Sequence, residues 1–453
     1  MDNKVVIAVA IVAVVLVAGI AAVVIVNNGN GSTTSDKSLD CKMRVLGNAN
    51  MDNYLNDDDV KYLEQYVKDV ESGKKIWNRV DEPLVDANDD GIINNEDVAL
   101  VKKFVNGQSA TMYYLDQDGT VRHVPYPLTG VLGTSYGICT EWSTGIDMAV
   151  ILGIDDKIKY VANSDIDASN LDPALYPNIS KYKTFGMKTP ALDVMWADGV
   201  RIMMGDHPKG FGSYCDTAEA LGFTIIKLPL NRAVNKVDSL DTLITLGAMY
   251  NLQDKTKPFI EFMEKVNAKI AAGHAAGATA LSYIIPYCAP GYEAFYVDAH
   301  GSGPMTTADV TLLEKLPVTS KVTTTAADGF DEMTADQLVA LNPDMFVVAM
   351  FAYASDKNVT VQQYQDAFKA WIQHGFDKST AGKNGKLYAL PFETCTLAGY
   401  ASILVLASKI WPNAYNEDEA WSLMQEYYDN FTNFDGDVKK SKFAPLVYSE
   451  LNA

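Results

Sequence analysis

Short apolar runs alternate with helix-like segments through the last three quarters of the chain. Eight apolar runs are predicted to be strands, at Thr129–Leu132, Ile158–Val161, Val200–Met204, Phe223–Leu228, Ala280–Ile285, Ala294–Val297, Met345–Ala349 and Lys386–Leu390. Segments with apolar residues at helical spacing separate them, at Gly145–Leu152, Thr217–Leu221, Ala335–Leu341 and Val361–His374. Strands that are separated by helices indicate parallel sheets with helical cover, which is an α/β fold.

One helical pattern is longer than the others and lies midway along this region. Residues Lys255–Gly273 carry apolar side chains at helical spacing, namely Phe259, Ile260, Met263, Val266, Ile270 and Ala271. The region from residue 111 to residue 453 is too long for one simple core. We therefore predict an N lobe at about 111–253 and a C lobe at about 275–453, joined by a rigid helix at about 254–274.

The N-terminus opens on a run of 22 residues, Val5–Val26, without one polar side chain. As a helix this run would span roughly 33 Å, about the thickness of a bilayer core. Residues 27–41 are rich in Asn, Gly, Ser and Thr, which is typical of a flexible stalk. We predict a transmembrane signal-anchor over residues 1–26 with the soluble domains extracytoplasmic, and a cleaved signal peptide is the alternative.

Two twelve-residue loops between the stalk and the α/β region repeat one metal-site pattern at an offset of 38 residues. Both place side-chain oxygens at positions 1, 3, 5, 9 and 12, and position 7 supplies a main-chain carbonyl in such loops. In loop one these residues are Asn48, Asn50, Asp52, Tyr54 (main chain), Asn56 and Asp59. In loop two they are Asp86, Asn88, Asp90, Ile92 (main chain), Asn94 and Asp97. The apolar face of the helix that follows each loop repeats as well, which indicates an internal duplication.

Calcium is the cation that this pattern favours, because it takes six to eight oxygen ligands and a tight loop converges them on one point. Gly91 at position 6 of loop two permits the positive φ of the turn, and Asn53 takes that position in loop one. Loop two has three carboxylates against two in loop one, so we predict two Ca²⁺ sites of which the second is stronger. Ion-free Asp/Asn turns are the alternative.

These half-EF-hands, with Asp at position 12 and one helix after each loop, resemble a type I dockerin over residues 42–107. The resemblance implies a small all-α calcium-binding domain and a cohesin-like surface protein as its partner. Recognition residues of that family lie at loop positions 10 and 11. Here these positions hold Asp57-Asp58 and Asn95-Glu96, where the family has Ser-Thr-type pairs.

The α/β region resembles the class III solute-binding proteins of ABC importers, which carry iron-siderophores, haem or vitamin B12. The resemblance rests on His123–Pro125 before a strand, the step at Lys157–Val161, the segment Met333–Asp344 and the late strand Lys383–Pro391. It implies two Rossmann-like lobes joined by a long helix, and an ABC permease as the partner. The expected ligand is an iron chelate, haem or a corrinoid.

Two acids are the candidates for permease docking. Asp336 falls on the family's acid in the C lobe, while Asp193 lies near the corresponding stretch of the N lobe. The alternative is that both are ordinary acids at helix N-termini, where the helix dipole favours them.

The ligand is expected between the lobes, in loops that follow strand carboxyl ends. Aromatic faces suit a macrocycle or a siderophore, and His and Tyr can ligate iron. The candidate ligand-binding residues are Tyr136, Trp142, His207, Tyr292, His300, Phe351, Tyr353 and Glu393. For each residue alone, core packing or surface exposure is the alternative.

The net negative charge of the chain argues against one class of partner. The chain has 37 basic and 57 acidic residues, a net charge of −20, which disfavours nucleic acid. No phosphate-binding glycine loop or HExxH motif occurs in the sequence. We therefore predict a binding protein and not an enzyme. Two alternatives stay open: a dockerin-bearing glycoside hydrolase at the cell surface, and an adhesion or scaffold protein.

Overall fold

A computed structural model of the chain describes residues 41–128, 131–134, 143–163, 171–186, 190–205, 214–230, 232–288, 295–298, 300–301, 305–307, 313–324, 330–350, 356–391 and 397–452. The predicted membrane span, Val5–Val26, lies outside these residues. Within the described part, no helix is both long enough and apolar enough to cross a bilayer.

The duplicated loops lead into two similar helices, α2 (Asp57–Glu71) and α3 (Asn95–Val105), which pack on each other. Each helix begins with a capping box in which the Asn at loop position 9 caps the helix and the Asp at position 12 reaches back to it. The repeated apolar face is buried as predicted: Val60, Leu63, Tyr66 and Val67 in α2; Val98, Val101 and Phe104 in α3. We call residues 42–107 the loop module.

A two-stranded antiparallel hairpin follows the loop module. Its strands are β1 (Ala110–Leu115) and β2 (Val121–Tyr126), so that His123–Pro125, expected only to precede a strand, belongs to a strand itself. Val45 of the loop module forms a β-bridge with Tyr114 of β1. The module and the hairpin are therefore joined by main-chain pairing.

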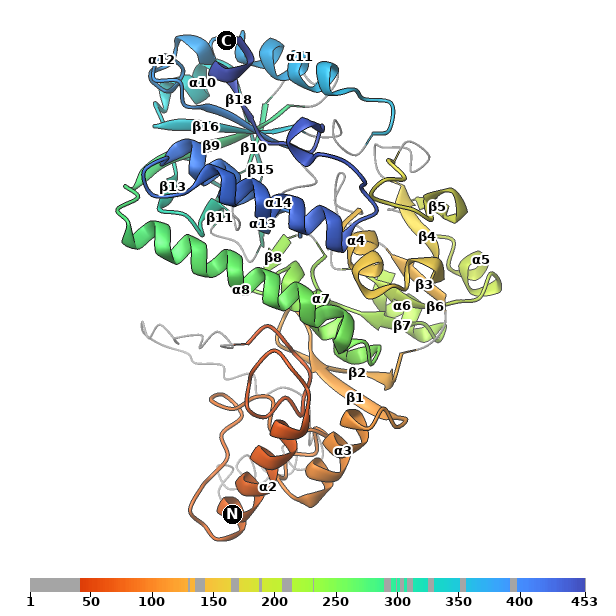
Figure 1. The fold of residues 1–453 in the computed structure, drawn as a ribbon. Helices are drawn as coiled ribbons and strands as arrows, with labels where there is room; N and C mark the ends of the chain where they lie inside the picture. The colour runs from red at the N-terminus through yellow and green to blue at the C-terminus, as the bar shows by residue number, and fades with distance from the viewer. Residues whose placement is uncertain are drawn as a thin grey trace, which may run out of the picture. The chain divides into compact units, whose positions relative to one another are not determined.

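The first large sheet has five strands in the order β5-β4-β3-β6-β7, all parallel (Figure 1). The strands are β3 (Val131–Thr134), β4 (Ile158–Asn163), β5 (Lys183–Gly186), β6 (Val200–Met204) and β7 (Thr224–Ile226). Helices α4 (Ser143–Leu152), α5 (Leu192–Ala197) and α6 (Cys215–Ala220) connect them. The chain moves outward from β3 to β5 and then crosses to β6, so the strand order reverses next to β3. Ligands of doubly wound sheets bind at such a reversal.

Two helices separate the first sheet from the second along the sequence. After the short strand β8 (Arg232–Val234), α7 (Ser239–Met249) is buried all round, and α8 (Gln253–Ala275) follows after a tight turn. The long helix predicted at Lys255–Gly273 is therefore present. Phe259 of α8 packs edge-on against Tyr400, Tyr427 and Phe431 of the last two long helices.

The second large sheet is mixed. Its order is β15-β10-β9-β16-β17-β18, and β13 also pairs with β9. Its strands are β9 (Leu281–Cys288), β10 (Phe295–Asp298), β13 (Val318–Ser320), β15 (Phe330–Met333), β16 (Met345–Met350), β17 (Leu387–Pro391) and β18 (Leu446–Val447). Its helices are α10 (Ala335–Ala340), α11 (Val361–Ile372), α12 (Thr380–Lys383), α13 (Gly399–Ile410) and α14 (Glu417–Phe431). Short strands β11 (His300–Gly301), β12 (Met305–Thr307) and β14 (Thr323–Thr324) form smaller pairs.

The sequence predictions held where the local pattern was strong. All eight predicted strands coincide with observed strands, and the four predicted helices coincide with α4, α6, α10 and α11. Among the elements that the sequence did not predict are β5, α7, α13 and α14. Helices α7 and α13 are buried on all sides, and such helices lack the one-sided apolar stripe that marks an amphipathic helix.

Arg44 fastens the loop module to the α/β region. Its main-chain N–H donates to Thr245 Oγ1 in α7 (3.0 Å), and its guanidinium donates to the carbonyls of Leu115 (2.9 Å) and Asp116 (3.1 Å). Gly107 lies against the Asn251 side chain after α7. Residues 39–453 accordingly form one compact unit with a shared core.

We expect Arg44→Ala to destabilise the module and the α/β region together. The change leaves two buried carbonyls without their donor, a cost of about 3 kcal/mol. Thermal unfolding, followed by circular dichroism and tryptophan fluorescence, should give one transition at a lower temperature. Lys68→Ala, at an exposed position of α2, serves as the control. Two separate transitions in the wild-type protein would contradict the shared unit.

Candidate functional site

The two loops repeat their internal hydrogen bonds position by position. Position 5 donates its N–H to the Asn at position 3, as Asp52 does to Asn50 (3.0 Å) and Asp90 to Asn88 (3.1 Å). Position 7 donates its N–H to the carboxylate at position 5, at 2.7 Å in loop one and 2.8 Å in loop two. The Asp at position 12 accepts from the N–H of position 9 at 2.9 Å in both loops. These bonds give the two loops the same local main-chain turn.

The loops differ at position 1. In loop two, the Asp86 carboxylate accepts from the N–H groups of Asp90 (3.2 Å) and Gly91 (2.9 Å). In loop one, the Asn48 side chain donates to the Asp52 carbonyl (2.7 Å), and its buried Oδ1 accepts no hydrogen bond from any described group. An orphaned buried acceptor at a ligand position is the kind of atom that a bound cation would satisfy.

Three carboxylates of the loops are fully buried: Asp59, Asp86 and Asp97. Burial raises the pKa of Asp59 to about 7 and that of Asp97 to about 6, and it also raises the pKa of Asp86. Main-chain N–H groups that donate to these carboxylates oppose the shift only in part. A buried carboxylate is unfavourable unless a cation lies close to it or it takes up a proton, so a cation bound in either loop would stabilise the ionised carboxylates.

The turn geometry corrects one expectation. Gly91 has a φ of 84° as predicted, and Asp89 before it also has a positive φ of 58°. In loop one the positive φ falls on Met51 (55°) at position 4, and Asn53 at position 6 is not among the described residues with positive φ. Instead, the Asn53 Oδ1 accepts the N–H of Lys42 (2.8 Å). Both loops therefore have a left-handed residue at position 4, and loop one lacks the second one that Gly91 supplies at position 6 of loop two.

The donor set of both loops fits a hard, oxygen-liganded cation. Carboxylate, amide and main-chain oxygens are the ligands that Ca²⁺ takes. Within the described part of the chain, no three His, Cys, Asp or Glu side chains are grouped closely enough to hold a metal by themselves. A cation in either loop would therefore need Asn and main-chain oxygens beside the carboxylates. This mixture suits calcium better than zinc.

The predicted ligand-binding residues follow the carboxyl ends of the large strands. Their segments come after β3, β6, β9, β16 and β17, at the edges where α/β folds bind ligands. The structure describes only the main chain of His300, in β11. The other seven lie outside the described residues: Tyr136, Trp142, His207, Tyr292, Phe351, Tyr353 and Glu393. Their role stays a prediction.

Both predicted docking acids are exposed in the first turn of a helix. Asp193 lies in α5 and Asp336 in α10, and each helix packs beside a different large sheet. Thr334 caps α10 with a capping box, so Asp336 is not needed as the cap. The carboxylate of Asp336 is therefore available to a partner.

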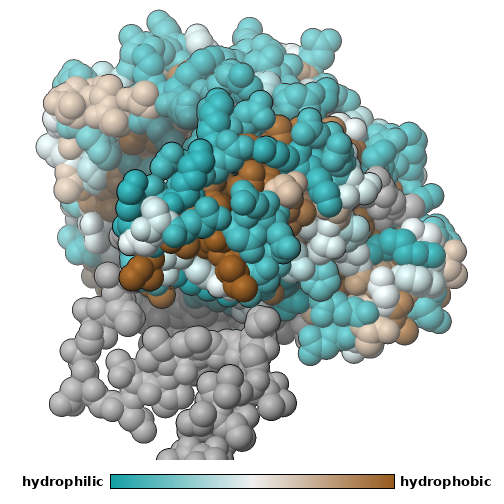
Figure 2. Space-filling view, turned by 90° about the horizontal axis from the view of Figure 1, so that it is seen from below, coloured by the Kyte–Doolittle hydropathy of each residue, from teal (hydrophilic) through white to brown (hydrophobic). Residues whose placement is uncertain are grey.

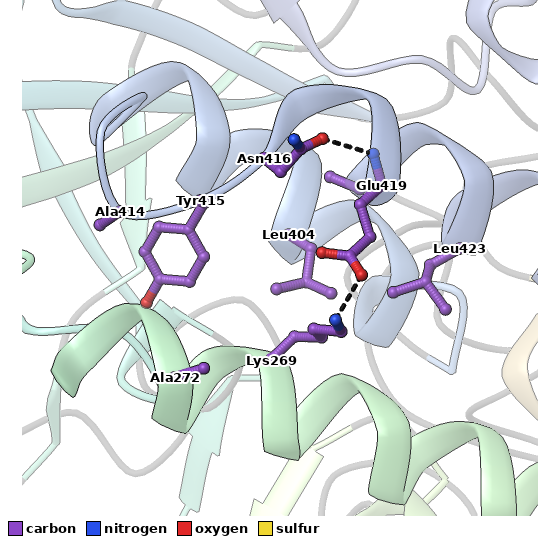
Figure 3. Close-up of a pocket in the computed structure, with 9 residues that line it drawn as sticks. Lys269, Ala272, Leu404, Ala414, Tyr415, Asn416, Glu419 and Leu423 are labelled. Atoms are coloured by element: carbon purple, nitrogen blue, oxygen red, sulfur yellow. Dashed lines mark hydrogen bonds and ion pairs between the residues drawn. The ribbon is translucent and has the colours of Figure 1, made fainter. Parts of the chain in front are cut away.

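A small pocket lies between α8 and α14 (Figure 3). Its volume is about 110 Å³, and Leu404, Tyr415 and Leu423 line it. Lys269 of α8 closes one side through an ion pair with Glu419. Pockets for drug-sized ligands usually measure about 300–1,000 Å³. A macrocycle would not fit here.

A buried charge cluster links the loop module to the start of α7, and the sequence analysis missed it. The Lys42 Nζ lies 3.1 Å from Asp238 Oδ2 and 3.0 Å from Asp241 Oδ2. Burial opposes ionisation of Asp238, but Lys42 beside it lowers its pKa; burial and the Asp238 charge raise the pKa of Asp241 to about 8. The partners are almost 200 residues apart in the chain, so no local pattern could reveal the cluster.

Gln253, the first residue of α8, is a second residue that the sequence did not single out. Its side-chain Oε1 accepts from the N–H of Leu55 (2.7 Å), and its Nε2 donates to the Leu55 carbonyl (3.0 Å). Leu55 is position 8 of loop one. A Gln at the start of a helix carries no sequence signal of such a contact.

The surface is mainly hydrophilic on the face seen in Figure 2, with scattered apolar residues. Among the described large apolar side chains, the most exposed are Ile76 (90%), Val80 (74%) and Ile92 (62%), all in the loop module. Exposed apolar side chains on one module favour contact with another protein when they are contiguous.

The fold matches that of periplasmic binding proteins. The TroA-like periplasmic binding protein FepB from Veillonella parvula is 13% identical; the match covers 74% of this chain and 99% of that chain, with a TM-score of 0.55. CeuE of Helicobacter pylori, in a structure with Ni-His, is 13% identical over 73% of this chain and 98% of that chain, with a TM-score of 0.51. No family model and no curated protein matches the sequence. The fold part of the predicted resemblance is thus confirmed.

The buried loop carboxylates predict a pH dependence for the metal-free protein. A carboxyl with a higher pKa in the folded state stabilises that state below its unfolded pKa, and this contribution is lost as pH rises through the folded pKa. For Asp59 and Asp97 the window runs from about pH 4 to about pH 7 and about pH 6, respectively. Each unit of raised pKa corresponds to about 1.4 kcal/mol.

Thermal unfolding in excess chelator, measured from pH 4 to pH 7, checks this expectation. The unfolding temperature should fall as pH rises, and Asp97→Asn should flatten part of the slope because the amide cannot ionise. Glu71→Gln, at an exposed position, should leave the slope as it is. If the stability of the chelated protein instead rises across this window, burial does not raise the pKa of the loop carboxyl groups.

Proposed function

We propose that the chain is the extracytoplasmic substrate-binding protein of an ABC importer. The observation that carries the proposal is the match to periplasmic binding proteins over 99% of the length of FepB, at a TM-score of 0.55. The order of the first sheet agrees with it, because the reversal beside β3 puts strand carboxyl ends at a ligand-binding edge. The enzyme and the adhesion protein remain alternatives without a specific supporting observation.

The proposed ligand is an iron chelate, haem or a corrinoid. Four aromatic residues and two histidines among the segments that follow the strands support a flat or metal-containing ligand: Tyr136, Trp142, Phe351, Tyr353, His207 and His300. One solved structure of CeuE is a Ni-His complex and another has Ni(II) bound, and both of these ligands contain a metal. The connecting helix α8 would limit lobe closure to a few degrees of hinge motion.

Delivery to an ABC permease would use the exposed acids Asp193 and Asp336, one beside each large sheet. The N-terminal run Val5–Val26 would anchor the protein in the cell membrane with its soluble part outside. A cohesin-like surface protein is the proposed partner of the loop module, whose exposed Ile76 and Val80 offer apolar contact area.

Ligand titration tests the proposal. Purified protein should bind haem, cobalamin or a ferric siderophore with a dissociation constant below about 100 μM, equivalent to about 5 kcal/mol. Trp142→Ala or Tyr353→Ala should cost about 1–3 kcal/mol, because each is expected to stack on the ligand. Binding of sugars or peptides, with no binding of the metal complexes and macrocycles, would sink the ligand assignment.

Asp336→Ala supplies the internal control for that titration. It should leave the ligand affinity unchanged and reduce uptake by cells, because the residue is proposed to contact the permease and not the ligand. Asp366→Ala, an exposed acid of α11, should change neither quantity.

We propose that the loop module binds two calcium ions, through Asn48, Asn50, Asp52, Tyr54, Asn56 and Asp59 in loop one, and Asp86, Asn88, Asp90, Ile92, Asn94 and Asp97 in loop two. The orphaned Asn48 Oδ1 and the three fully buried carboxylates support it. Bound calcium would neutralise the buried carboxylates and stabilise the folded state.

Calcium should therefore raise the unfolding temperature of the full chain. At a hundredfold excess over the dissociation constant, the bound ion adds about 2.7 kcal/mol to the free energy of unfolding. Asp86→Ala with Asp97→Ala should remove more of this gain than Asp52→Ala with Asp59→Ala, since loop two has more carboxylates. Asp57→Ala with Asp58→Ala, exposed acids outside the ligand set, should remove none. Unfolding that is indifferent to calcium and to chelator would rule out the calcium sites.

A further inference from the structure

Loop one is held from outside the loop module by the side chain of Gln253. The Gln253 amide pairs with both the N–H and the carbonyl of Leu55, at 2.7 and 3.0 Å. Such two-point pairing is what a neighbouring strand provides in a sheet. Leu55 directly follows Tyr54, whose carbonyl is the proposed main-chain ligand at position 7. The amide of Gln253 therefore fixes the peptide next to a ligand oxygen.

A second contact holds loop one from the neighbouring helix. The Asn53 Oδ1 accepts the N–H of Lys42 (2.8 Å), and the ammonium of Lys42 pairs with Asp238 and Asp241 at the start of α7. Helices α7 and α8 meet at a tight corner, where the N–H of Leu252 donates to the Gly247 carbonyl (2.7 Å). The two contacts thus tie loop one to both ends of α7, through Lys42 at its start and through Gln253 just beyond its last turn.

Loop two has no comparable support among the described residues. No hydrogen bond of the described part of the chain joins Ile93, its position 8, to a side chain outside the loop module. Arg79, which pairs with Asp89 and lies 3.9 Å from Asp86, belongs to the module itself. Loop two carries Gly91 and Asp86 instead, which give it the turn and the charge within its own sequence.

We infer that Gln253 is a positioning residue for calcium site one. Calcium binding in loop one and the position of the α8 N-terminus are then thermodynamically linked. The inference rests on the calcium binding proposed above. Loop one lacks a glycine at position 6 and a carboxylate at position 1, so outside support compensates for weaker internal order. Linkage is reciprocal: a ligand that shifts the start of α8 changes the calcium affinity of loop one and leaves that of loop two unchanged.

Terbium luminescence in the full chain tests the inference. Terbium occupies oxygen-liganded calcium sites and is sensitised by a nearby tyrosine, and Tyr54 is in loop one while its counterpart in loop two is Ile92. The variant Asp86→Ala/Asp97→Ala identifies the signal that belongs to loop one, and displacement by calcium gives the calcium affinity. Gln253→Ala should weaken binding at loop one roughly tenfold, as expected for two lost hydrogen bonds.

Two further variants sharpen the result. Gln253→Glu keeps the acceptor for the Leu55 N–H but sets a carboxylate oxygen against the Leu55 carbonyl, so one lost hydrogen bond and the repulsion between the two oxygens should weaken binding at loop one. Gln362→Ala, which removes an exposed glutamine from the first turn of α11, is the matched control and should have no effect. Calcium binding at loop two should be the same in Gln253→Ala, Gln253→Glu and Gln362→Ala as in the wild-type protein.

Thermal unfolding separates positioning from general stability. If Gln253 only supports the fold, Gln253→Ala lowers the unfolding temperature equally with calcium and with chelator; positioning instead shrinks the calcium-dependent gain. A wild-type protein that binds neither terbium nor calcium overturns the calcium proposal, and the inference with it. A wild type that binds at both loops, with Gln253→Ala indistinguishable from it, overturns the inference alone.

Discussion

The neutralisation of two buried carboxylates at the start of α7 is the constraint on which much of the fold depends. Asp238 caps α7, and Asp241 completes the capping box, so both acids lie in the protein interior. The raised pKa of Asp241, about 8, leaves this carboxyl largely protonated at neutral pH, so the pair holds one buried negative charge that needs a cation close by. Lys42 supplies that cation from the loop module. The core helix of one region is therefore completed by a charge from another.

The loop module is packed on the α/β region and shares contacts with it. The sequence predicts residues 42–107 as a separate small all-α domain. In the structure, Arg44 donates to the carbonyls of Leu115 and Asp116, and Val45 pairs with the hairpin. The module shares its core with the α/β region. Events in the loops can thus reach the α7–α8 corner through a few short contacts.

The two loops share one hydrogen-bond pattern and differ in how their turns are held. Loop two obtains its turn from Gly91 and its charge from Asp86, both within the loop. Loop one has Asn53 and Asn48 at these positions, and its main chain is fixed from outside, by Gln253 among others. Duplication supplied the same hydrogen-bond pattern, and the tertiary neighbourhood made the copies unequal.

The sequence by itself determined the elements that have a local period. It gave correct positions for the eight strands, for the long helix α8 and for the repeated loops, because alternation and helical spacing are written in neighbouring residues. The α/β class follows from their order. The eight ligand-binding residues could be nominated only by their place after strands, since that rule names a sheet edge and not a particular side chain.

Only the tertiary structure decided which distant residues meet. The contact between Gln253 and Leu55 joins positions 198 apart in the chain, and that between Lys42 and Asp241 joins positions 199 apart. Neither pair has a local signature, because a side-chain amide or ammonium looks the same in a sequence whether it faces water or a buried carboxylate. Helices α7 and α13 were not predicted from the sequence for a related reason: a fully buried helix has no polar face, so its apolar residues form no one-sided stripe. Packing, which depends on the whole chain at once, fixed these parts of the protein.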